Sequence, residues 1–169
     1  VLSGRAALEV WVDKSVGSDT AGRGTSESPY ATIQKGVGEV AEGGTVWVRP
    51  GDYSTGETVD ADGSLNRVYI TKNLTLAATG DRRETIIRGA SASDASASNL
   101  GCGDTAVRCV RVAGGTKVVV RGFTLTGGRT RRDSNWGGVS QNYGGGVHGS
   151  GSDGSIQVQD CIISDCAAR

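Results

Sequence analysis

Residues 28–54 read SPYATIQKGVGEVAEGGTVWVRPGDYS, and they set a short amphipathic segment directly before a strand. The apolar residues of the first half recur at i, i+4, i+7 and i+8, which is one face of a helix: Ile33, Val37, Val40 and Ala41. Either Ser28 or Thr32 can begin this helix, and Gly43-Gly44 can end it. A helix over Thr32–Glu42 is too short to be stable alone, so we expect it to lie on an apolar surface.

The rest of the chain consists of short β-branched strands that recur in one order. Stretches that begin at Val68, Cys109 and Gly146 each contain a strand, a Gly or Asn turn, a second strand, a tight bend and a third strand. Aliphatic or aromatic residues occupy equivalent places: Leu74, Leu76, Val118, Val120, Ile156 and Val158, then Ile86, Ile87, Phe123, Leu125, Ile162 and Ile163. This pattern predicts a degenerate repeat with a basic unit of roughly 22 residues.

Three short strands per repeat, each alternating inward aliphatic and outward polar residues, are typical of a parallel β-helix. Each coil would stack about 4.8 Å from the next. The hydrophobic content of 36%, the single Phe and the lack of Met agree with a thin aliphatic column. A β-sandwich would instead need hairpin turns and reversed strand order. The sequence therefore favours an all-β solenoid of about four coils, with the helix as an N-terminal amphipathic cap over the open end.

We expect a single domain over residues 1–169. It divides into an entry strand and loop, the cap helix and the coils, which carry two loop insertions: residues 1–27, 28–44, 45–169, 90–106 and 127–145. No helix or aromatic plug follows the last repeat, and a bare coil exposes strand edges. We therefore expect further coils of a longer chain, a partner that caps the column, or end-to-end stacking of identical chains.

The N-terminal part resembles the signature of the pectin-lyase-like, right-handed parallel β-helix superfamily. Five elements carry the resemblance, namely GSD, GRGT, PYATIQ, GTVWV and PGDY at residues 17–19, 22–25, 29–34, 44–48 and 50–53. Residues 143–168 also resemble the Gly-Gly-aliphatic repeats of bacterial surface proteins, through Gly145-Gly146-Val147. The resemblance implies a right-handed coil. It leaves function open among polysaccharide lyases, glycoside hydrolases, tail spikes, adhesins and surface proteins.

Catalysis of the kinds found on this fold needs carboxylates in defined places. A lyase needs a carboxylate cluster for calcium and a base, and a hydrolase needs two or three neighbouring carboxylates. The recognisable outward strand positions carry other side chains: Arg49, Thr71, Arg108, Arg111, Lys117, Arg121, Gln157 and Gln159. No catalytic residue can be assigned, and His148 is interpreted as an outward surface side chain.

The sequence DADGS, which begins at Asp60, resembles the start of a calcium loop through Asp60 and Asp62. Its later Glu and third ligand are missing, so a polar turn is favoured over a structural calcium site. No other cofactor is predicted.

The insertion 127–145 contains the residue types that bind glycans: Arg129, Arg131, Arg132, Asn135, Trp136 and Tyr143. Arginine forks bind the carboxylates of acidic sugars, and a Trp face can stack on a sugar ring. The alternative is a solvated loop whose Trp packs back on the coil. We expect any glycan contact to involve this loop.

Charge and cysteine content limit the partners and the compartment that the sequence suggests. The 18 basic and 18 acidic residues balance, which argues against nucleic acid as a partner. No apolar run approaches the ~20 residues of a membrane span. The four cysteines lack the spacing of a zinc site, so we expect disulfides in an oxidising compartment. We expect a Cys102–Cys109 disulfide. Cys161 and Cys166 either form a second disulfide or both point along the column.

Two functions remain on these grounds. The first is a secreted or cell-surface, non-catalytic β-helix module with a structural or adhesive role, which contacts glycans or self-assembles end to end. The alternative is the N-terminal part of a secreted polysaccharide lyase or glycoside hydrolase whose catalytic coils lie outside this chain. Stacked carboxylates on consecutive coils would distinguish the second from the first.

Overall fold

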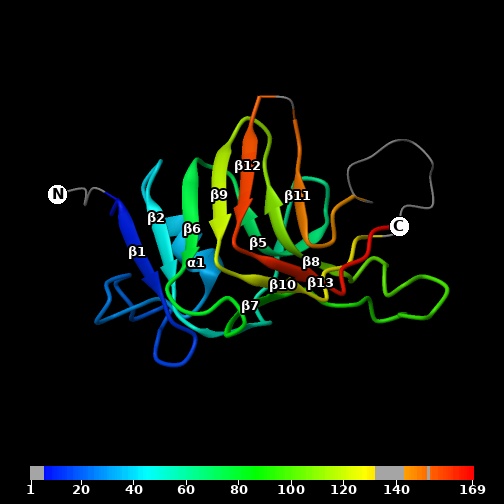
Figure 1. Ribbon diagram of the computed structural model, residues 1–169, viewed down its shortest axis with the longest axis horizontal. Coiled ribbons are helices and arrows are strands. Elements are labelled where there is room, and N and C mark those ends of the chain that lie inside the picture. Colours follow the sequence, from blue (N-terminus) through cyan, green and yellow to red (C-terminus); the bar gives the residue numbers. More distant parts are fainter. Residues whose placement is uncertain (1–5, 132–142, 152) are drawn as a thin grey trace.

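The computed structural model, which describes residues 6–131, 143–151 and 153–169, is a parallel β-solenoid of about 4 turns (Figure 1). Three sheets run along it. Sheet A contains β1 (Glu9–Val12), β2 (Thr45–Val48), β6 (Leu74–Ala78), β9 (Lys117–Arg121) and β12 (Ser155–Gln159). Sheet B contains β3 (Gly51–Tyr53), β7 (Thr85–Arg88), β10 (Thr124–Thr126) and β13 (Ile162–Ser164). Sheet C contains β4 (Thr58–Val59), β5 (Leu65–Ile70), β8 (Val107–Val112) and β11 (Val147–Gly149).

The strand register confirms the predicted repeat. In sheet A, Leu74 lies opposite Val118, and Val118 lies opposite Ile156 one coil further on. Every described strand pair is parallel except β4 with β5, which is antiparallel. Each coil therefore repeats the same sheet order, and equivalent aliphatic side chains stack into one column.

The bend between β9 and β10 shows how narrow the core is. Gly122 adopts a φ of 80°, a conformation that glycine tolerates best. It lies so close to β6 that a Cβ there would come within 3.2 Å of Ala78. The next residue, Phe123, is fully buried, and its ring fills the column at the bend. Tyr30 and Tyr53 are the other aromatic residues of the described core, and the remaining members are aliphatic or cysteine, which agrees with the predicted thin core.

The helix α1 (Ile33–Glu39) is shorter than the predicted segment. Its N-cap is Thr32, whose side chain accepts a hydrogen bond from the Lys35 N–H, and Asp19 in turn accepts one from the Thr32 hydroxyl. The helix ends at Glu39 because Val40 takes an extended conformation and places its side chain in the core, where it is 1% exposed. The predicted boundary at residue 42 was therefore wrong.

The side chain of Gln34 joins α1 to sheet C. The helix takes the place of a sheet C strand in the first coil, before β2 and β3, and packs against β5. The Gln34 amide donates to the Tyr69 carbonyl at 3.1 Å and accepts from the Tyr69 N–H at 2.8 Å. It thereby pairs with backbone groups of β5 as a neighbouring strand would. Lys72 donates to the carbonyls of Gly38 and Val40 at the other end of the helix.

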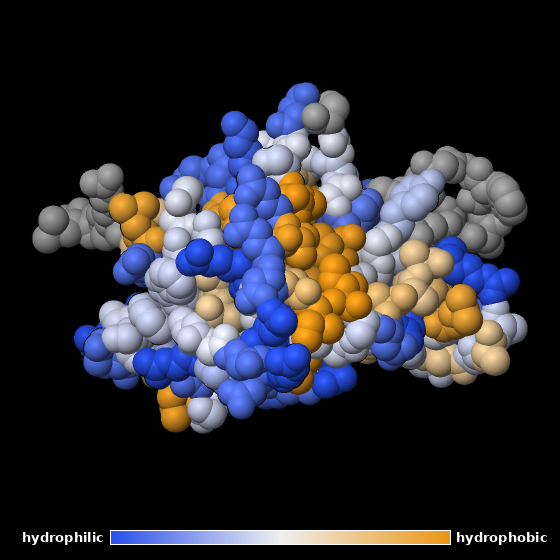
Figure 2. Space-filling view, in the orientation of Figure 1, coloured by the Kyte–Doolittle hydropathy of each residue, from blue (hydrophilic) through white to orange (hydrophobic). Residues whose placement is uncertain are grey.

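Apolar side chains of the last coil are more exposed than those of the coil before it. Val158 and Ile163 are 42% and 53% exposed, although their equivalents one coil earlier are buried. Figure 2 shows apolar surface beside the polar column that β12 presents.

The described part of the chain contains no helix long and apolar enough to cross a membrane.

Candidate functional site

Buried polar and charged side chains gather on sheet C and on the turn before β5. We call the following six residues the Arg–His cluster: Asp60, Ser64, Asn66, Arg108, Arg111 and His148. Each is less than one-tenth exposed. Arg111 on β8 lies directly opposite His148 on β11, because the two strands pair in parallel. The coil repeat thus sets charged side chains side by side on one face.

The carboxylate of Asp60 lies at the centre of this cluster. Its Oδ2 atom accepts from Arg111 Nε at 3.2 Å and from Asn66 Nδ2 at 3.2 Å, and Arg108 Nη1 lies 3.6 Å away. Its Oδ1 atom accepts the N–H groups of Asp62 and Ser64, which closes the turn. The carboxylate is thus a buried, paired anion that fixes the turn 60–64 above β8.

This arrangement corrects the interpretation of one face of sheet C as facing solvent. Arg108, Arg111 and His148 are buried and not solvent-facing, because the turn 60–64 folds over that face of the sheet. Asp62, the other member of the calcium-like sequence, pairs with Arg111 at 3.2 Å. Both carboxylates bind arginine. Within residues 6–131, 143–151 and 153–169, no three His, Cys, Asp or Glu side chains gather as metal ligands.

Four buried atoms of the cluster have no hydrogen-bond partner: Ser64 Oγ, Asn66 Oδ1, Arg111 Nη1 and His148 Nδ1. Leaving one such group unpaired costs about 1–3 kcal/mol, so native proteins rarely contain several together. The set includes a cationic donor in Arg111 and an obligate acceptor in Asn66 Oδ1. A polar molecule that offers both acceptors and donors, a water included, would satisfy it.

The imidazole of His148 is neutral at physiological pH. Burial, together with the nearby positive charges of Arg111 and Arg108, lowers its pKa to about 4. A neutral imidazole has one donor and one acceptor nitrogen. His148 therefore adds hydrogen-bonding capacity to the cluster without adding positive charge.

Two of the predicted glycan-binding residues lie at the rim of the cluster. The Tyr143 carbonyl accepts from Arg108 Nε at 3.2 Å, and its 59% exposed ring lies 6.2 Å from the His148 ring. Arg131 lies against the turn, where a Cβ on Gly63 would come within 3.3 Å of its Nη1 atom. It also donates to Asp104 at 3.0 Å and so joins the two loop insertions.

The other predicted residues lie elsewhere. Arg129 forms an ion pair with Asp165 at 2.9 Å, on the last coil. Arg132, Asn135 and Trp136 fall outside the described residues. The structure therefore brings Arg131 and Tyr143 to the Arg–His cluster and directs Arg129 away from it.

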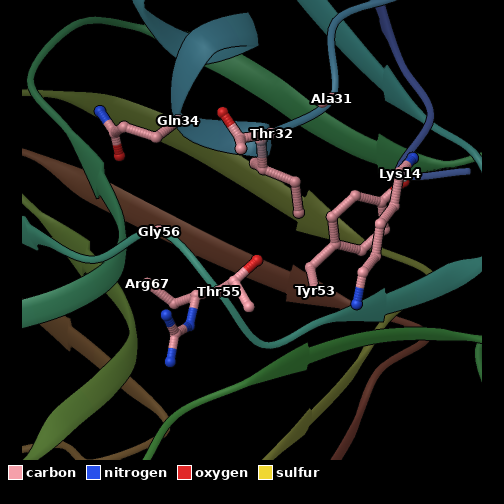
Figure 3. Close-up of a pocket in the computed structure, with 9 residues that line it drawn as sticks. Lys14, Ala31, Thr32, Gln34, Tyr53, Thr55, Gly56 and Arg67 are labelled. Atoms are coloured by element: carbon pink, nitrogen blue, oxygen red, sulfur yellow. Dashed lines mark hydrogen bonds between the residues drawn. The ribbon is translucent and has the colours of Figure 1, made fainter. Parts of the chain in front are cut away.

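A small hollow lies between the start of α1, β3 and the segment that follows β3 (Figure 3). Its walls include Thr32, Gln34, Tyr53 and Arg67. The space open to the centre of a water molecule is about 20 Å³, which suits a single water. Arg67 Nε donates a hydrogen bond to the Arg88 carbonyl oxygen at 2.8 Å. This hollow is too small for a sugar ring.

No protein-family model matches this chain, and no curated protein matches it either. The class of protein is therefore defined by the fold alone, as a parallel β-solenoid of about 4 turns with one short helix.

The structure does not show the predicted disulfides, because all four cysteines are free thiols in it. Cys102 stays in its loop, where the Thr130 hydroxyl donates to its sulfur at 3.6 Å, whereas Cys109 turns toward the Thr126 carbonyl at 3.3 Å. Cys161 and Cys166 point back along the column, toward the carbonyls of Val120 and Leu125. The thiols of Cys109 and Cys166 are instead the two that interact between neighbouring coils, where each shifts the pKa of the other.

We predict that Cys166 reacts with alkylating agents at a lower pH than an ordinary thiol. The hydrogen bond from Cys109 stabilises the thiolate and lowers the Cys166 pKa to about 7. The rate of iodoacetamide labelling, followed by peptide mass spectrometry, should therefore rise with a midpoint near that pH. Cys109→Ala removes the donor and should move the midpoint upward, with half-buried Cys161 as the internal reference. An unchanged midpoint in Cys109→Ala would contradict the assignment.

Proposed function

We propose that this chain is a non-catalytic, secreted or cell-surface β-helix module that binds an acidic glycan at the Arg–His cluster. Its N-terminal motifs support a place in the pectin-lyase-like, right-handed parallel β-helix superfamily. The observation that carries the proposal is the buried Arg111 Nη1 atom, which lacks a partner beside an unpaired acceptor, Asn66 Oδ1. An adhesive role follows from binding without turnover.

The chemistry of a uronic acid matches these unpaired atoms. Its carboxylate supplies acceptors for Arg111, and its hydroxyls supply donors for Asn66 Oδ1 and a partner for His148 Nδ1. The exposed ring of Tyr143 gives an amphipathic surface at the entrance. Inorganic phosphate or sulfate offers mainly acceptors and would leave Asn66 Oδ1 unpaired, so an acidic sugar fits better than a simple anion.

The carboxylates of the cluster support binding more than hydrolysis. A glycosidase needs one carboxyl group as acid and a second as base or nucleophile, each within reach of the sugar. Asp60 is 1% exposed and engaged by Arg111 and Asn66, and Asp62 is also paired with Arg111. Neither is placed as a free catalytic group, and no described observation favours a lyase or hydrolase.

Arg111→Lys should weaken binding of a uronic-acid monosaccharide by about tenfold or more, because a point charge replaces the guanidinium fork. Tyr143→Ala, at the exposed rim, should weaken it by a smaller factor. Isothermal titration calorimetry with galacturonic acid measures both, and the carboxyl-reduced sugar tests the need for the acid. Arg83→Lys, at a 71% exposed side chain, is the matched control.

Circular dichroism will establish that each variant is folded. The proposal is rejected if neither change affects the affinity, if the reduced sugar binds equally well, or if galacturonic acid does not bind the folded wild-type chain. Release of reducing sugar from an oligogalacturonide would instead favour the hydrolase.

A further inference from the structure

The outer face of sheet A carries two tryptophans in register. Trp11 on β1 pairs with Trp47 on β2, and their ring centroids lie 6.1 Å apart with the planes inclined by 32°. The Arg49 guanidinium lies 5.5 Å from the Trp11 ring centre, and that of Arg121 lies 5.6 Å from the Trp47 ring centre. We call these four residues the Trp–Arg ladder.

The strand pattern explains why these rings lie outside. In β1 and β2, each Trp is flanked by valines that are at most 2% exposed and face the column: Val10, Val12, Val46 and Val48. Successive side chains of a strand point to opposite faces, so both indoles face outward. They remain partly exposed. The core does not require them, and two adjacent aromatic rings on a sheet face are a common means of contacting a ligand.

A small residue on the strand between them lets Arg121 reach Trp47. Arg121 is two strands away from Trp47, with β6 between them. At that position β6 carries Ala77, which pairs with both Trp47 and Arg121 and is fully buried. The small residue lets the guanidinium reach across the strand to the indole.

Charge on this face differs from the balance of the whole chain. The 18 basic and 18 acidic residues of the sequence cancel. Across the described strands of sheet A, the exposed ionisable positions are Glu9, Lys117 and Arg121. Arg49 follows directly after β2 and forms an ion pair at 3.3 Å with the buried Asp13, which follows β1. Cations therefore outnumber acids around the two indoles. An anionic ligand complements this face.

We propose that the Trp–Arg ladder is a second carbohydrate-binding surface, which takes an extended anionic polysaccharide running along the solenoid axis from β1 to β9. Neighbouring strands lie about 4.8 Å apart, which is comparable with the length of one sugar unit. Sugar rings stack on the indoles of Trp11 and Trp47, while carboxylate groups bind Arg121. Asp13 and the Ser26 carbonyl hold Arg49 beside the Trp11 ring. Single-stranded nucleic acid also uses stacked aromatics with arginine, but it needs a stronger basic groove than this face provides.

The test uses polygalacturonate in affinity electrophoresis and tryptophan fluorescence. The double variant Trp11→Ala/Trp47→Ala should lose at least about tenfold in polymer affinity, as aromatic stacking surfaces do when truncated. Arg121→Ala removes an exposed cation with no core contact, so it keeps the test valid if the double variant fails to fold. It should weaken polymer binding by a smaller factor and reduce quenching of the indoles. Arg83→Ala is the neutral control.

The two binding surfaces can be separated, because they lie on different sheets. Arg111→Lys should weaken galacturonic acid but leave polymer binding at the ladder in place, whereas Arg121→Ala should do the reverse. The proposal is overturned if polymer affinity is unchanged in both ladder variants, or if an oligonucleotide of equal length binds more tightly than polygalacturonate.

Discussion

Replacement of Asp60 by Ala should lower the free energy of unfolding by about 3–5 kcal/mol, or prevent folding at 37 °C. The change leaves Arg108 and Arg111, which are 1% and 6% exposed, without their common buried counter-charge. It also removes the acceptor that holds the N–H groups of Asp62 and Ser64 in the turn. Urea unfolding followed by circular dichroism measures the loss.

A matched control is Asp104→Ala, which also removes a carboxylate paired with arginine. Asp104 is 76% exposed and contacts Arg131 at the surface, where ion pairs contribute little. Its unfolding curve should stay close to that of the wild type. If Asp60→Ala behaves like the control, the cluster does not depend on its central anion.

Val37→Asp in the cap helix should cost more than about 4 kcal/mol of unfolding free energy. Val37 is 2% exposed and belongs to the main core cluster, so the carboxylate would be buried without a partner. Differential scanning calorimetry should show a large fall in melting temperature, or no native transition. Removal of the helix seal should also expose the column to hydrophobic dyes.

Gly38→Asp places the same charge at the next residue, where it is harmless. Gly38 is exposed, and a Cβ built there meets no atom within 4 Å. Its melting temperature should stay within a few degrees of the wild-type value. Equal melting temperatures for both variants would show that α1 does not seal the core.

The repeat could be read from the sequence because a solenoid is built from local patterns. Leu74, Val118 and Ile156 share a place in each unit, and the structure pairs them in that register. Alternation within a strand fixes the inward side, and stacking of identical coils fixes the partner. The Trp–Arg ladder was also present in the alternation EVWV and TVWV, although its significance appears only when Trp11 and Trp47 lie in register.

The candidate site could not be read in the same way, because it depends on a contact between distant segments. Asp60 meets Arg111 across 51 residues, through a turn whose path no repeat dictates. Strand alternation places Arg111 and His148 outside the column, and only the folded turn buries them. The pairing of the cysteines could not be read from the sequence for a related reason. Coil stacking brings Cys109 beside Cys166, whereas nearness in sequence suggested Cys102.

The amide of Gln34 has a consequence for how this molecule resists fibril growth. A solenoid end that offers free N–H and C=O groups is a template on which another chain can add strand by strand. On sheet C, Gln34 occupies both backbone groups of Tyr69, and on sheet A the loop residues Gly24 and Tyr30 occupy those of Trp11. Elongation from this face must first displace the helix, so loss of the cap is the step at which amyloid-like polymerisation would begin.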